Sequence, residues 1–84
     1  MKDCYITFRS ITAAQRGESV LRRSRIDAIL QRTPRWMEEL GCGYSLGIRR
    51  EQAGEVSGIL KKAGIAYRKI YSQKENGAFE EWNP

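Results

Sequence analysis

The chain has 84 residues, enough for one small domain with a single core. It carries a net charge of +5, mostly from arginine, and this biases any partner toward an anionic one. It has no histidine, which excludes a Cys-His nucleophile pair, a histidine proton shuttle and a histidine-containing zinc site within one chain. Because no long apolar run or signal segment is present, we expect a cytoplasmic protein without a membrane partner.

The first half of the chain predicts a strand, a helix and a second strand. Alternation over Cys4 to Phe8 predicts a strand that buries Cys4, because free cysteines usually lie inside a protein. Thr12 followed three residues later by Gln15 fits a capping box, so we expect an amphipathic helix that begins at Thr12. A short apolar run predicts a second strand over Ala28 to Gln31.

The second half of the chain predicts a strand, a helix and another strand. The segment from Tyr44 to Ile48 alternates and favours a strand. Apolar residues at helical spacing predict a helix over Glu51 to Ala63, which Gly64 would close at its C-terminus. The segment from Ile65 to Tyr71 predicts the fourth strand.

This order of elements predicts an α+β, ferredoxin-like βαββαβ fold. Two βαβ halves with right-handed crossovers would form a four-stranded antiparallel sheet with two helices on one face and an open second face. We expect this domain to cover residues 1–72. Residues 73–84 would form a polar, flexible C-terminal tail unless Phe79 and Trp82 dock on the domain or on a partner.

Cys42 is the candidate reactive residue, because it stands between Gly41 and Gly43 in a long loop. Flanking residues without side chains leave the thiol sterically open. Arg35 and Arg49 flank the loop and its strand, and either could lower the pKa of the thiol. Two isolated cysteines do not supply the four ligands of a zinc site, so no metal is expected. The alternative is that the two glycines only make a turn.

Short segments in a fixed order carry a family resemblance: Ile6-Thr7-Phe8, Thr33-Pro34-Arg35, Cys42-Gly43 before an apolar strand ending at Arg49, and Gly64-Ile65 with Tyr67. They resemble the small bacterial family described as putative selenium/sulfur carrier protein-like (DUF3343), from about Tyr5 to Tyr71. The matching motif positions are Pro34, Arg35, Cys42 and Gly43.

The resemblance implies that Cys42 holds sulfur or selenium as a persulfide or selenopersulfide. A cysteine desulfurase-like donor would load the thiol, and an acceptor enzyme would receive the atom. Such a carrier works through its own thiol, so the resemblance implies no organic cofactor and favours a thiol carrier over an enzyme.

Two other functions stay open at this point. Tyr5, Tyr67 and Tyr71 beside Arg68 and Lys69 could make the open sheet face an RNA-binding platform, although the basic-glycine-aromatic signature of such strands is missing. The same face could instead pair two copies of the chain, as a homodimer or a protein-interaction module.

Overall fold

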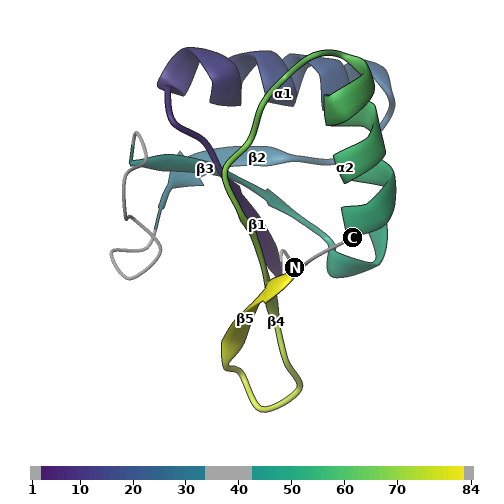
Figure 1. Cartoon of the computed structure of the whole chain (residues 1–84). Helices are drawn as coiled ribbons and strands as arrows, with labels where there is room; N and C mark the ends of the chain where they lie inside the picture. The colour runs from purple at the N-terminus through teal and green to yellow at the C-terminus, as the bar shows by residue number, and fades with distance from the viewer. Residues whose placement is uncertain (1–2, 34–42, 83–84) are drawn as a thin grey trace.

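The computed structural model describes residues 3–33 and 43–82 (Figure 1). Its elements are, in chain order, β1 (Cys4–Thr7), α1 (Ile11–Arg23), β2 (Ile29–Arg32), β3 (Tyr44–Ile48), the short 3-10 helix η2 (Arg50–Gln52), α2 (Ala53–Lys62), β4 (Ile70–Gln73) and β5 (Phe79–Trp82). The predicted α+β class is confirmed. Within the described ranges, neither helix has the length and apolar character needed to cross a membrane.

The strands form one sheet in the order β2-β3-β1-β4-β5, and every neighbouring pair is antiparallel. The first four strands lie in the order that two βαβ halves with right-handed crossovers produce. The ferredoxin-like name for this arrangement stays our interpretation. The number of strands is five, so the prediction of a four-stranded sheet is wrong.

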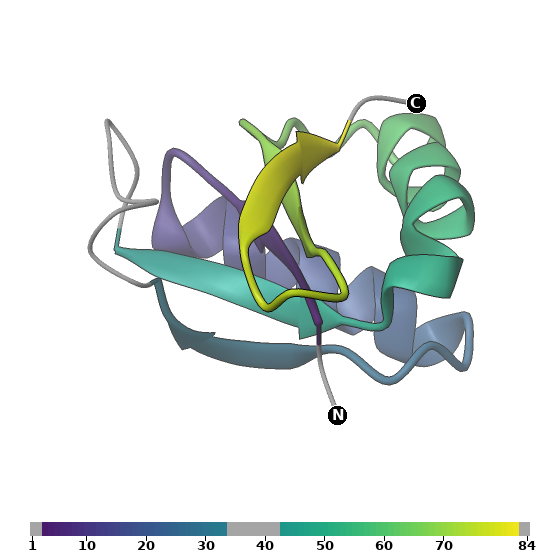
Figure 2. The ribbon, with the colours of Figure 1, turned by 90° about the horizontal axis from the view of Figure 1, so that it is seen from below.

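The fifth strand comes from the segment that the sequence assigned to the C-terminal tail (Figure 2). A tight turn makes the hairpin possible: Gly77 has a φ of 89°, and the side-chain oxygen of Asn76 accepts a hydrogen bond from the Ala78 N–H at 2.9 Å. Phe79 then packs against Tyr5, with 5.5 Å between the ring centroids. This contact supplies the apolar burial that a short edge strand needs.

Most predicted element boundaries differ from the observed ones by one or two residues, and the starts of α1 and β4 differ for identifiable reasons. Helix α1 begins at Ile11 because Ser10, with extended backbone, is the N-cap and its hydroxyl accepts the Ala13 N–H at 3.1 Å. Strand β4 begins at Ile70, five residues later than predicted. The N–H of Ile65 donates to the Leu60 carbonyl and helps to end α2, so the chain is still in the helical layer at that point.

Both helices pack on the same face of the sheet, and Gly17 of α1 shows how closely. A Cβ at this glycine would lie 3.2 Å from Leu46 of β3, 3.3 Å from Phe8, which directly follows β1, and 3.5 Å from Leu60 of α2. Two strands and two helices therefore share one core around this point. The predicted inward face of β1 is confirmed, because its Cys4 and Ile6 side chains are fully buried.

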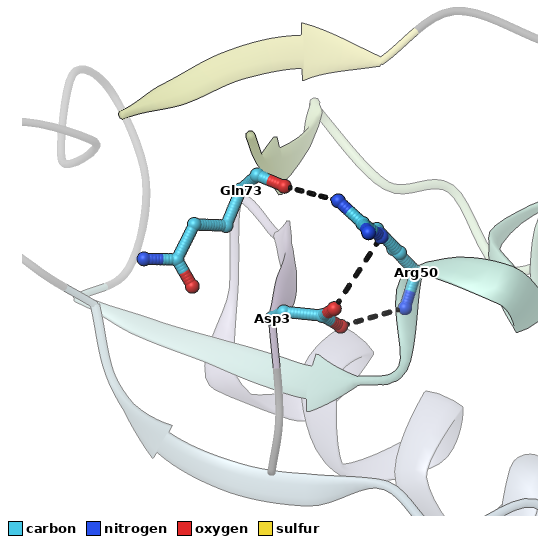
Figure 3. Close-up of polar contacts among 3 residues, drawn as sticks. All are labelled: Asp3, Arg50 and Gln73. Carbon is cyan, nitrogen blue, oxygen red and sulfur yellow. Dashed lines mark hydrogen bonds and ion pairs between the residues drawn. The ribbon is translucent and has the colours of Figure 1, made fainter. Parts of the chain in front are cut away.

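A polar cluster joins three segments at the end of the sheet where β3 finishes (Figure 3). The backbone N–H of Arg50 donates to Asp3 Oδ1 at 2.8 Å, and its Nε lies 3.6 Å from Asp3 Oδ2. One terminal guanidinium nitrogen of Arg50 donates to the Gln73 carbonyl at 2.8 Å. These contacts connect the start of β1, the start of η2 and the end of β4, and we call them the Asp3–Arg50–Gln73 clamp.

Candidate functional site

The chain leaves the sheet after β2 and returns at β3, and these two points lie side by side. Arg32, the last residue of β2, is paired with Tyr44, the first residue of β3. Beyond this pair, the Thr33 N–H donates to the Gly43 carbonyl at 2.9 Å. Both attachment points of the predicted cysteine loop are therefore held at one end of the sheet, which we call the Gly43 end.

Gly43 has a backbone conformation that favours glycine. Its φ is 84°, in the left-handed region where a residue with a Cβ is strained, and the residue is buried. The sequence selected Gly43 as a loop-shaping residue. Its geometry supplies a physical reason for a glycine directly after the candidate cysteine.

Two exposed arginines lie at the Gly43 end. The guanidinium carbon of Arg32 is 5.6 Å from the centre of the Tyr44 ring, which is a cation–π contact. Arg9 follows the end of β1, and the antiparallel pairing of β1 with β3 brings that end next to the start of β3. Neither arginine was predicted as a site residue, because only the strand register shows that they share this end with Gly43.

Arg49, which the sequence selected as a possible activator, lies at the other end of β3. It comes six residues after Gly43, and at about 3.3 Å per residue of strand the two positions are roughly 20 Å apart. Ionic screening acts over about 8 Å at physiological salt, so an exposed charge at Arg49 has little effect at the Gly43 end. The structure does not bring these two predicted site residues together.

Four predicted site residues, Pro34, Arg35, Gly41 and Cys42, lie outside the described residues. Their roles stay predictions. In the part of the chain that the structure does describe, no three acidic or cysteine side chains come together as a metal site would require.

Cys4, the other cysteine, is a free thiol in the core. It is fully buried and lies opposite Ile48 in the sheet. Burial, and to a smaller extent the negative charge of Asp3, raises the pKa of the Cys4 thiol to about 12. Burial makes the thiol inaccessible and disfavours its thiolate form, so Cys4 is unsuited to nucleophilic chemistry, and the prediction of a buried cysteine is confirmed.

The aromatic platform that the RNA-binding alternative requires is not assembled. The hydroxyl groups of Tyr67 and Ser57 are hydrogen-bonded at 2.7 Å, which holds Tyr67 against α2. Tyr71 is only 9% exposed, and Tyr5 packs against Phe79. Base stacking needs accessible ring faces, which these three tyrosines do not present together.

Comparisons with known proteins agree with the resemblance seen in the sequence. A family model described as "Putative Se/S carrier protein-like" matches residues 3–72. The searches of curated proteins and of solved structures each found no match. The matched range covers every strand and helix before β5 except the last residue of β4, together with the segment that contains Cys42. The chain therefore belongs to the Putative Se/S carrier protein-like family.

Proposed function

We propose that this protein is a cytoplasmic carrier that holds sulfur or selenium on Cys42 and delivers it to an acceptor enzyme. The observation that carries this proposal is the family match over residues 3–72, which includes Cys42. A cysteine desulfurase-like enzyme would be the donor. The carrier itself would catalyse no reaction and would need no organic cofactor.

The state of Cys4 supports Cys42 as the loaded residue. The chain contains two cysteines, and the transferring group must be an accessible thiolate. Cys4 is fully buried, with its thiol pKa raised to about 12, and so fails both requirements. Cys42 is the remaining thiol.

The loading step is a thiol exchange on the outer sulfur of a donor persulfide. The Cys42 thiolate attacks that sulfur, a new S–S bond forms on Cys42, and the donor S–S bond breaks to release the donor thiolate. Delivery repeats the exchange: an acceptor thiolate attacks the outer sulfur, and Cys42 leaves as thiolate. Electrons balance in each step, so no external oxidant or reductant is needed. Selenium in place of the outer sulfur follows the same scheme.

The Gly43 end is electrostatically suited to this chemistry. Both the thiolate and the loaded anion are negatively charged, and Cys42 is bonded to Gly43. Arg32 and Arg9 are exposed at the same end of the sheet. Positive charge near a thiol favours its ionised form and so lowers its pKa. Arg35, within the loop itself, is the activator that the sequence favours.

The first test measures sulfur uptake by intact-mass spectrometry after incubation with a persulfide donor such as glutathione persulfide. We expect a mass increase of one sulfur atom in the wild type and in Cys4→Ala, and no increase in Cys42→Ser. The pH dependence of iodoacetamide alkylation gives the Cys42 pKa, which should lie below the reference of about 8.5. A Cys42 thiol that has an unshifted pKa and takes up no sulfur would overturn the proposal.

A further inference from the structure

A groove runs along α1 on the helical side of the molecule. Two adjoining hollows of about 390 and 230 Å³ form it, and together they are lined on one side by residues of α1 and the two residues before it, and on the other by residues 63–67. Arg16 and Ile65 line both hollows, so the two are continuous. In Figure 1 the segment between α2 and β4 crosses α1, which makes the second wall.

Three arginines are spaced along the groove. Arg9 lines the smaller hollow, Arg23 lines the larger one, and Arg16 lies between them in both. All three are exposed, and none forms an ion pair with a residue that the structure describes. Arg22, by contrast, lies on the same helix but is paired with Glu18 at 3.3 Å. The groove thus contains three positive charges that are not neutralised within the described structure.

The remaining lining is small, apolar or uncharged. Val20 is half-buried and supplies aliphatic surface, whereas Ile65 is only 4% exposed and lies beneath the groove. Three alanines and a glycine also line the hollows, together with four uncharged polar residues, Ser10, Thr12, Gln15 and Ser19. No aspartate or glutamate is among the lining residues, so the groove combines a small apolar floor with a row of cations. Its complement is a segment with apolar side chains on one stripe and carboxylates beside that stripe.

We propose that this groove docks an acidic, amphipathic α-helix of a partner protein. Arg16 and Arg23 are seven residues apart on α1, so they are separated by about 10.5 Å along the helix axis. Carboxylates seven residues apart on a second helix have the same spacing. Arginine suits the contact, because its planar guanidinium binds carboxylates in a bidentate geometry.

A nucleic acid fits the groove less well. Single-stranded nucleic acids bind to basic grooves through aromatic side chains on which bases stack. The one aromatic residue in the lining is Tyr67, and its hydroxyl is committed to Ser57. The small apolar floor fits aliphatic side chains.

The experiment measures binding of a fluorescein-labelled peptide to the full chain by fluorescence anisotropy at low salt. The peptide is a helix of about 20 residues with leucine on one stripe and glutamate seven residues apart beside it. A peptide with the same residues in shuffled order is the control. We expect Arg16→Gln to weaken binding about threefold and the double variant Arg16→Gln, Arg23→Gln about tenfold.

Matched variants separate docking from general charge. Arg16→Lys keeps the charge but loses the planar guanidinium that binds carboxylates in a bidentate geometry, so its affinity should lie between those of the wild type and Arg16→Gln. Arg22→Gln removes one charge from the same helix outside the two hollows and should change affinity less than twofold. Because Arg16 is exposed, its variants should fold, and thermal melts check this. Cys42→Ser should bind like the wild type, so the outcome does not depend on the proposed carrier function.

Three results would overturn the docking proposal. The shuffled peptide could bind as tightly as the designed one, or Arg22→Gln could weaken binding as much as Arg16→Gln. A single-stranded oligonucleotide of the same net charge could bind more tightly than the peptide, which would assign the groove to nucleic acid.

Discussion

A cysteine and an arginine lie at or next to each end of β3, but their surroundings differ between the Ile48 end and the Gly43 end. At the Ile48 end, Cys4 is fully buried beside Asp3, and Arg50 is engaged by Asp3 and Gln73. At the Gly43 end, the chain continues from Cys42, and the arginine nearest in the sheet, Arg32, is exposed above a tyrosine ring. At the Ile48 end the arginine holds neighbouring segments together, and at the Gly43 end the arginine is exposed to solvent.

This contrast shows how a structural arginine differs from an arginine that is available to an anion. The Arg50 guanidinium has two protein partners, and its backbone N–H is bound as well, so its donors contribute to the fold. Arg32, by contrast, lies over the ring of Tyr44, and no ion pair joins its guanidinium to a described residue. Residue type and sequence position alone do not make this distinction.

The largest expected effect is a loss of stability at high pH through Cys4. Burial and the charge of Asp3 raise the pKa of this thiol from 9.0 to about 12. Between these values the unfolded chain has lost a proton that the folded chain keeps. The free energy of unfolding should therefore fall by about 1.4 kcal/mol for each pH unit above pH 9. This contribution is complete below pH 9 and is lost by about pH 12.

Urea unfolding at several pH values between 8 and about 11 measures this slope. Cys4→Ala is the control, because it removes the titrating thiol while leaving Asp3 in place. Lysines and tyrosines titrate in the same range, so the informative quantity is the difference in slope between the two proteins. Equal slopes would contradict the assignment.

A smaller effect is expected from opening the Asp3–Arg50–Gln73 clamp. Arg50→Gln removes the ion pair to Asp3 and the hydrogen bond to the Gln73 carbonyl. The Arg50 side chain is 47% exposed, so solvent screens the pair, and we expect a loss of about 1 kcal/mol. In a domain of this size that lowers Tm by about 4–8 °C.

The neighbouring Arg49→Gln is the matched control for the clamp. Arg49 is exposed, and no ion pair joins it to a described residue, so its removal should change the unfolding free energy by less than about 0.5 kcal/mol. A similar loss from both variants would mean that net charge, and not the clamp, sets stability at this end.

Much of the fold was predictable because it depends on local patterns. Alternation over Tyr44–Ile48 predicted β3 with its observed bounds, and the inward face of β1 followed from the same period. The predictions of secondary structure failed where a contact between residues distant in the sequence determines the structure of a segment. The segment before Ile70 alternates like a strand, but Ile65 is needed to close α2. Phe79 pairs with Gln73 of β4, and its ring packs against the ring of Tyr5, more than seventy residues away in the sequence.

The candidate site was less predictable than the fold, for a related reason. Sequence proximity to Cys42 selected Arg49, yet a strand of five residues carries the chain to the far end of the sheet. Arg32 and Arg9 are distant from Cys42 in the sequence and reach the Gly43 end through β2 and β1. Strand pairing brings these two arginines to the Gly43 end. They could be identified as site residues only once the order of the strands was known.

The smallest effect separates the two ends of β3 by their influence on the Cys42 thiol. Even at a separation of about 8 Å through water, a positive charge is worth only roughly 0.5 kcal/mol, which is less than half a pKa unit. Arg32→Gln should therefore raise the Cys42 pKa by a few tenths at most, as measured by iodoacetamide alkylation against pH at low salt. It should change stability by less than about 0.5 kcal/mol, because the lost cation–π contact is exposed.

Arg49→Gln removes the same charge from the Ile48 end and should leave the Cys42 pKa unchanged, because roughly 20 Å of strand separates it from Gly43. High salt should abolish the effect of Arg32→Gln, since screening acts on exposed charges first. If Arg49→Gln moved the pKa as much as Arg32→Gln, the thiol would respond to net charge alone. The Gly43 end would then have no special role in activating Cys42, and Arg35 would be the remaining candidate.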